Sequence, residues 1–180
     1  MSGWSNKAFL IRPFAESDWP SIWAFIEPVF RAGETYAVDT DIGESAARAS
    51  WIDRGTNVYV VADETDRVVG VYYLKANHAG PGGHVCNCGY IVAAAARGQG
   101  LAERMCLHSH ETGLRLGFRA MHFNCVVSTN TTAIKLWQKL GFEIVGTLPK
   151  AFDHPVEGFV DAYVMFKQLA PQRDNPDERP

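Results

Sequence analysis

The sequence predicts a mixed α/β domain, with one sheet covered by helices on both faces. Three observations support this prediction: β-branched segments alternate with amphipathic segments, the order reads β α α β β β α β α β β, and no linker or repeat divides the 180 residues. A chain of this length can bury the core of one domain. We expect that domain over residues 1–169, and a polar, proline-rich, disordered tail over residues 170–180.

The first half of the chain contains strands and two helices. Residues 7–12 (KAFLIR) predict a first strand, which Pro13 ends. Residues 16–18 (ESD) supply caps for a helix through the apolar positions that follow, and a second helical pattern covers residues 44–54. The segments NVYVVAD and RVVGVYYLKA, joined by a short turn, predict a hairpin over residues 57–76.

The second half repeats the alternation of strand and helix. Each strand is rich in β-branched or aromatic residues, and each helix carries an apolar stripe. The expected elements are a strand at 84–92, a helix that ends near 116, a strand at 120–127, a helix at 130–140, and strands at 142–147 and 159–168.

The composition is typical of a globular protein and gives no reason to expect a charged partner. Hydrophobic residues make up 47% of the chain, charged residues 21%, and the formal charge is −3. We therefore expect no nucleic acid and no membrane as partner. The N-terminal residues do not have the pattern of a secretory signal, so we expect a cytoplasmic protein.

The cysteine spacing does not favour a metal site. The Cys86-x-Cys88 pair is closer than the C-x-x-C spacing of zinc or redox motifs, and strand spacing would place both sulfurs on one face. A metal site that also uses histidines is the alternative to reduced, buried thiols. We favour the thiols and expect no metal. The residues considered are Cys86, Cys88, Cys106, Cys125, His84, His108 and His110.

A glycine turn between a strand and a helix is the most informative segment. In Arg97-Gly98-Gln99-Gly100-Leu101-Ala102 the glycines let the backbone approach a ligand, and the first amides of the helix favour an anion such as a pyrophosphate. The turn lacks the Gly-Lys-Ser/Thr of a P-loop and the last Gly/Ala of a dinucleotide fingerprint. By itself, this Gly-x-Gly could also be an ordinary helix cap.

A second motif follows the glycine turn in the sequence, and the two motifs together indicate a protein family. Residues 128–142 contain Asn130, Ala133 and the ending Leu140-Gly141-Phe142. Together, the two segments resemble the GNAT acetyltransferase superfamily, whose pyrophosphate loop is Q/R-x-x-G-x-G/A and whose second landmark is N-x-x-A followed by L-G-F. The resemblance covers residues 7–169, since the order of elements also agrees.

The resemblance implies a GNAT fold and acetyl-CoA as acetyl donor. The fold is a single mixed, mostly antiparallel sheet in which the fourth and fifth strands splay apart around the pantetheine arm. Backbone groups of Ile91 and Val92 would contact the pantetheine, and a backbone N–H at a bulge of the fourth strand would stabilise the oxyanion. The amides of residues 97–102 would hold the pyrophosphate, and Asn130 would contact the same molecule.

One departure from the family concerns the proton donor. Many members have a tyrosine where this chain has Trp137, which we interpret as a core residue on the apolar stripe. The leaving thiolate would then take its proton from water or from the ammonium. For deprotonation of the amine, His84 and a chain of waters held by Asn87 remain alternatives.

Two strand asparagines are candidate catalytic residues. Asn87 and Asn124 would bind or orient a small acceptor, or alternatively satisfy backbone groups where the sheet splits. The surrounding strands resemble the fungal L-azetidine-2-carboxylate/proline-analogue N-acetyltransferases, in which asparagines at these positions serve the substrate site. The loop with Glu34 and Tyr36 is similar to the acceptor-pocket loop of phosphinothricin and methionine sulfoximine acetyltransferases.

These resemblances predict an enzyme that acetylates a small amine, an amino acid or a toxic amino-acid analogue, in a detoxifying role. The alternatives are a peptide or protein N-terminal acetyltransferase, which would need an open groove, and a non-catalytic acyl-CoA-binding module. A homodimer is compatible with the family, although no residue of the sequence identifies an interface.

Overall fold

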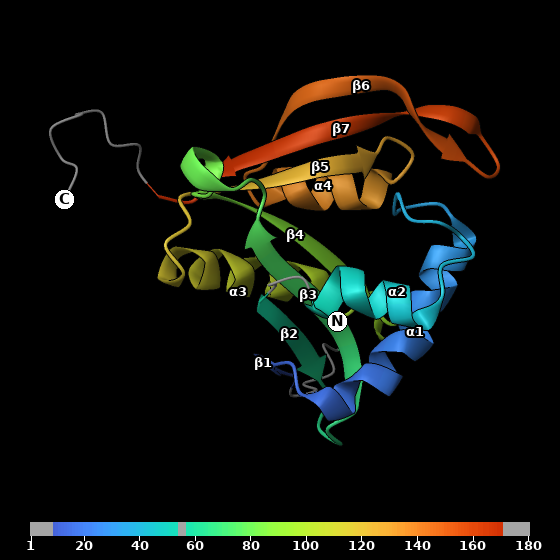
Figure 1. The fold of residues 1–180 in the computed structure, drawn as a ribbon, viewed down its shortest axis with the longest axis vertical. Coiled ribbons are helices and arrows are strands. Elements are labelled where there is room, and N and C mark those ends of the chain that lie inside the picture. The colour runs from blue at the N-terminus through green and yellow to red at the C-terminus, as the bar shows by residue number, and fades with distance from the viewer. Residues whose placement is uncertain (1–8, 54–56, 171–180) are drawn as a thin grey trace, which may run out of the picture.

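The computed structural model describes residues 9–53 and 57–170. Three expected regions lie partly outside these ranges: residues 171–180 of the tail expected over 170–180, residues 7 and 8 of the first strand, and the last residue of the second helix. Seven strands of the described chain form one sheet, in the order β1-β2-β3-β4-β5-β7-β6 (Figure 1). Their bounds are β1 Leu10–Pro13, β2 Asn57–Ala62, β3 Val68–Ala76, β4 Val85–Val92, β5 Ala120–Val127, β6 Glu143–His154 and β7 Gly158–Gln168.

Helices cover both faces of this sheet, as the sequence predicts. One face packs against α1, α2 and the π-helical turn η2, and the other packs against α3 and α4 (Figure 1). Short 3-10 turns connect several elements. The helical bounds are η1 Glu16–Asp18, α1 Trp19–Ala32, α2 Glu44–Arg48, η2 Ala49–Asp53, η3 Gly80–Gly82, η4 Ala94–Ala96, α3 Leu101–Arg115 and α4 Thr131–Lys139.

The helix α1 shows how the sequence builds the first core. Trp19, Ile22, Ile26 and Phe30 are buried, at the spacing that puts residues on one helical face. The expected cap works differently, because the Asp18 carboxylate accepts from the Arg12 guanidinium at 2.7 and 2.9 Å instead of from the helix. This ion pair ties β1 to the start of α1.

The sheet splits between β4 and β5, as the resemblance implies. These two strands are the parallel pair of the sheet, and the other strand pairs are antiparallel. Only residues 85–87 pair with residues 120–122, although both strands continue for five more residues. The strands therefore form a fork that closes at the pair Asn87 and His122.

A bulge in β5 lies just beyond the fork. Phe123 pairs with Met165 and Val126 pairs with Tyr163, so β5 has one more residue here than β7. Before the bulge, Met121 and Phe123 face the core under α3 and α4; after it, Val126 does. The bulge therefore shifts the alternation of β5 by one residue at the open part of the fork.

Two elements differ in extent from the sequence prediction. The second helix changes to π-helical geometry at Ala49, which accompanies the burial of Trp51 against the rings of Phe30 and Tyr73. The strand expected to end at residue 147 continues to His154, because Leu148 and residues 152–154 also pair with β7. Pairing between strands extends this edge strand where side-chain alternation gives no signal.

Candidate active site

The turn before α3 has the geometry of an anion site. Gly98 and Gly100 adopt φ angles of 76° and 72°, a left-handed conformation that favours glycine. A Cβ at either position would meet no atom within 4 Å, so the backbone conformation, and not crowding, requires glycine here. Glycine at these positions therefore supports a left-handed backbone, in addition to the close approach to a ligand that the sequence predicts.

The amides at the start of α3 provide the donors. Hydrogen bonding within the helix begins with the Arg104 N–H to the Gly100 carbonyl at 3.1 Å, so the amides of residues 101–103 precede it and have no acceptor within the helix. Arg97 is exposed beside them and takes part in none of the ion pairs found among the described residues. The amides and the guanidinium together favour a diphosphate.

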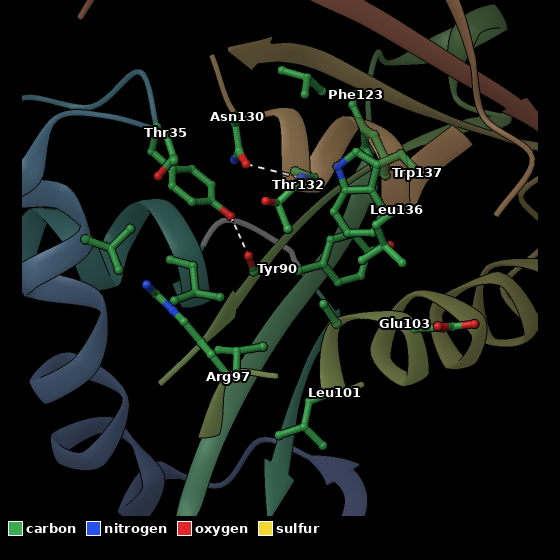
Figure 2. Close-up of a pocket in the computed structure, with 18 of the residues that line it drawn as sticks. Thr35, Tyr90, Arg97, Leu101, Glu103, Phe123, Asn130, Thr132, Leu136 and Trp137 are labelled. Carbon is green, nitrogen blue, oxygen red and sulfur yellow. Dashed lines mark hydrogen bonds between the residues drawn. The ribbon is translucent and has the colours of Figure 1, made fainter. Parts of the chain in front are cut away.

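A cavity of about 610 Å³ extends from this turn into the fork. Figure 2 shows Arg97 and Leu101 on one side of it, with Asn130 and Thr132 from the start of α4 across from them. Gln99, which the sequence also assigned to the turn, does not line the cavity. The residues predicted to contact acetyl-CoA that do line it are Ile91, Val92, Arg97, Gly98, Gly100, Leu101, Ala102 and Asn130.

The backbone of β4 offers alternate residues to the cavity. The Ala93 N–H bonds to the Val69 carbonyl, and the Val85 carbonyl accepts from Asn77, so odd-numbered residues face β3. The backbone groups of Tyr90 and Val92 therefore face the open side, whereas the Cys88 N–H belongs to the last pairing with β5, at Asn87 and His122. Val92 thus directs its backbone groups to the open side, whereas Ile91, for which a backbone contact was also expected, directs its amide to β3; both residues line the cavity.

The expected bulge in β4 is wrong. Seven consecutive pairs join residues 70–76 to residues 86–92 without a shift in register. The amides of β4 become available because β5 turns away after residue 122, so no local distortion of β4 is required. Beyond that pairing, the even-numbered amides of Tyr90 and Val92 have no partner strand on the open side.

Tyr36 comes from the segment between α1 and α2 and lines the same cavity. Its hydroxyl donates to the Tyr90 carbonyl at 2.7 Å (Figure 2). Burial raises the pKa of Tyr36 well above its usual value, so the hydroxyl stays protonated. Glu34, predicted beside it, is exposed and does not line the cavity.

The start of α4 forms another part of the wall. The Asn130 side chain caps this helix by accepting from the Ala133 N–H at 3.2 Å, and it also lines the cavity. Trp137 is buried, as predicted, and its ring lies 5.2 Å from the rings of both Tyr90 and Phe123. Trp137 also lines the cavity, so one face of this core residue borders the site.

The two candidate asparagines lie outside the lining of the cavity, at the closed end of the fork. Asn87 is buried; it donates to the His122 carbonyl at 2.9 Å and accepts from the Tyr73 hydroxyl at 3.0 Å. Asn124 is exposed and donates to the Asn77 side chain at 2.8 Å. Both asparagines thus have internal partners, and each retains further donors or acceptors for a ligand.

Sequence reasoning missed several residues of this site. Asn77 and His122 join the two asparagines, and the hydroxyl of Thr132 and the thiol of Cys125 border the cavity. The sequence gives only a weak signal for these residues, because their proximity to one another depends on which strands pair. The proposed base His84 is exposed, and its ring bonds to the Pro81 carbonyl of its own turn.

The cysteines are free thiols, and Cys86 and Cys88 share the face under α3 and α4 as expected. Burial raises the pKa of Cys86 and of Cys106 to about 12. The described residues contain no group of three or more His, Cys, Asp or Glu side chains placed to hold a metal ion. No helix within the described ranges is long and apolar enough to cross a membrane.

Comparison with known proteins agrees with this geometry. The family model of the acetyltransferase (GNAT) family matches residues 19–142. The N-acetyltransferase aca1 of Schizosaccharomyces pombe is 29% identical over 158 residues, which cover 78% of this chain and 75% of that protein.

Solved structures share the fold. A GCN5-related N-acetyltransferase from Kribbella flavida is 41% identical with a TM-score of 0.86, and the match covers 89% of this chain and 98% of that one. A phosphinothricin acetyltransferase from Sinorhizobium meliloti, solved with acetyl-CoA, is 22% identical with a TM-score of 0.79, over 94% of this chain and 97% of that one.

Proposed function

The chain belongs to the acetyltransferase (GNAT) family, whose donor is acetyl-CoA, and from this premise we propose that it acetylates a small amine, an amino acid or a toxic amino-acid analogue. Acetylation would remove the positive charge of the acceptor, which suits a detoxifying role in the cytoplasm. The similarity of the asparagine strands to the proline-analogue branch supports this choice of acceptor.

The hydrogen bond between Tyr36 and Tyr90 is the observation that carries the preference for a small acceptor. It fixes the segment between α1 and α2 against the open edge of β4. A peptide would need a groove that is open along this edge. A small molecule can instead be enclosed between the segment and the fork.

The reaction follows from the layout of the cavity. The turn at residues 97–102 would hold the diphosphate, and the open edge of β4 would hold the pantetheine, leaving the thioester near the closed end of the fork. The acceptor nitrogen forms a bond to the thioester carbon, the C–S bond breaks with its electron pair on sulfur, and one proton passes from nitrogen to sulfur overall. The amide of Tyr90, the first even-numbered amide of β4 beyond the pairing with β5, is the candidate to stabilise the oxyanion.

Most of the rate enhancement would come from orientation, without a covalent enzyme intermediate. Asn87 and Asn124 would orient the amine, because both have amide groups at the closed end of the fork. Asn87 is the more rigid of the two, since it is buried with two partners.

The test measures release of free thiol from acetyl-CoA with a panel of amino acids, their analogues and short peptides. For Asn124→Ala we expect kcat/KM for the acceptor to fall about 10–100-fold, while the KM of acetyl-CoA stays within about twofold. The exposed Lys135→Ala is the matched control on α4. Unchanged kinetics of Asn124→Ala would remove this residue from the site.

The same panel separates the alternatives. Preferential turnover of peptides would indicate an N-terminal acetyltransferase. Binding of acetyl-CoA without turnover of any amine would indicate an acyl-CoA-binding module and would overturn the proposed function.

A further inference from the structure

Lys75 is a half-buried cation without a carboxylate partner. It lies near the end of β3, and the ion pairs of the described residues do not include it. Its ammonium lies 5.2 Å from the centroid of the Tyr73 ring, which offers a weak attraction only. With an aromatic ring as its neighbour, the ammonium is available to an anion from outside the chain.

The register places Lys75 in one row with the closed end of the fork. Lys75 pairs with Asn87 across β3 and β4, and Asn87 pairs with His122 across β4 and β5. Adjacent strands are about 4.8 Å apart, so the Lys75 backbone lies roughly 10 Å from that of His122. A lysine side chain and a small molecule together can span that distance.

These residues share the face of the sheet that is covered by α1 and η2. The Tyr73 ring packs against Trp51 of η2, and it occupies the space over Gly89, where a Cβ would lie 2.6 Å from it. Lys75 and Asn77 follow Tyr73 at two-residue spacing, which keeps them on the same face. We place the acceptor on this face, because Asn124 is exposed on it, whereas Cys86 and Met121 on the opposite face are buried in the core under α3 and α4.

Hydrogen bonds on this face fix which groups are donors. Asn124 donates to the Asn77 oxygen, so the Asn77 amide NH₂ faces His122 Nδ1 at 2.9 Å. Nδ1 then accepts, and the neutral ring carries its proton on Nε2. None of the linked side chains is a carboxylate. The linked side chains are Tyr73, Asn77, Asn87, His122 and Asn124.

We infer that Lys75 binds a carboxylate that the acceptor carries beside its amine, so that the acceptor class is an α-amino or α-imino acid. The inference rests on the proposed function, because it describes the acceptor of that reaction. A cationic acceptor without a carboxylate would meet an uncompensated ammonium here. An α-carboxylate on Lys75 would leave the adjacent nitrogen directed toward the fork.

The experiment compares each α-amino or α-imino acid with its own α-carboxamide, using acetyl-CoA as donor and thiol release as readout. In the unmodified protein we expect kcat/KM to be at least about tenfold higher for the acid than for the amide. Lys75→Met keeps the apolar stem and removes the charge. It should lower kcat/KM for the acids about 10–100-fold and for the amides less than about threefold.

Lys75→Arg is the matched control and should retain most of the preference for acids, and thermal unfolding of each variant checks the fold. An equal loss on acids and amides, or no preference in the unmodified protein, would overturn the role of Lys75 while leaving acetyl transfer intact. Absence of turnover with every amine would instead overturn the proposed function, and the inference with it.

Discussion

At the scale of single residues, Tyr36 is held at both its ring and its hydroxyl. Its ring contacts Phe30 and Trp51 at centroid distances of 5.9 and 5.6 Å, and its hydroxyl bonds to the Tyr90 carbonyl. Aromatic contacts fix the ring, and the hydrogen bond fixes its end. The residue thus connects the helical face to the open edge of β4.

Tyr36→Phe removes the hydroxyl and keeps the ring. The Tyr90 carbonyl would lose its partner, so we expect the free energy of unfolding to fall by about 1 kcal/mol and kcat/KM for the acceptor to fall about tenfold. Denaturant unfolding and steady-state kinetics measure the two effects. If both quantities stay at the level of the unmodified protein, the bond does not organise the site.

At the scale of elements, α4 contributes side chains both to the hydrophobic core and to the wall of the cavity. Its buried Trp137 packs between Tyr90 of β4 and Phe123 of β5, on the two sides of the fork. Phe142, just after the helix, stacks on Phe123 at 4.3 Å. The aromatic cluster therefore holds the parted strands through side chains where backbone pairing has ended.

Trp137→Ala should cost about 3–5 kcal/mol of stability, because it leaves a large cavity in this cluster. Trp137→Phe should lose less stability and keep kcat within about threefold, since the indole is not needed as an acid. Trp137→Tyr restores the hydroxyl that many family members have, and we expect no increase in kcat. A Trp137→Phe variant that folds normally yet loses its activity would show a chemical role for the indole.

At the scale of the whole molecule, His110 links α3 to the far part of the sheet. It is buried, its Nε2 lies 3.3 Å from Cys106 Sγ, and its Nδ1 lies 3.4 Å from the Lys167 ammonium. Burial, and then the charge of Lys167, lower the pKa of His110 to about 4. The His110 side chain of the folded protein is therefore the neutral imidazole near neutral pH.

This pKa predicts a loss of stability in acid. Between about pH 6.5 and pH 4 the unfolded chain binds a proton at His110 that the folded chain does not, so stability falls as the pH falls through this window. After allowance for solvent screening, we expect the contribution between pH 7 and pH 5 to be about 1 kcal/mol. Denaturant unfolding at several pH values measures it, and His110→Asn should show a shallower pH dependence. Equal slopes for the two proteins would contradict this account.

The sequence by itself determined the features that are encoded locally. The glycine turn, the start of α3, the Asn130 cap and the strand alternation lie within short segments, because backbone conformation and helix termini depend on neighbouring residues. The family resemblance then joined two such segments into one site. Most element boundaries agree within a few residues for the same reason.

Only the tertiary structure decided which groups meet at the fork. The partnership of Tyr36 with Tyr90, the row of Lys75, Asn87 and His122, and the direction of the β4 amides depend on register between distant segments. A shift of one residue would move each side chain to the opposite face of the sheet. Register comes from packing of the complete chain, which no short segment contains. The proposed acceptor side of the site therefore depends on the fold.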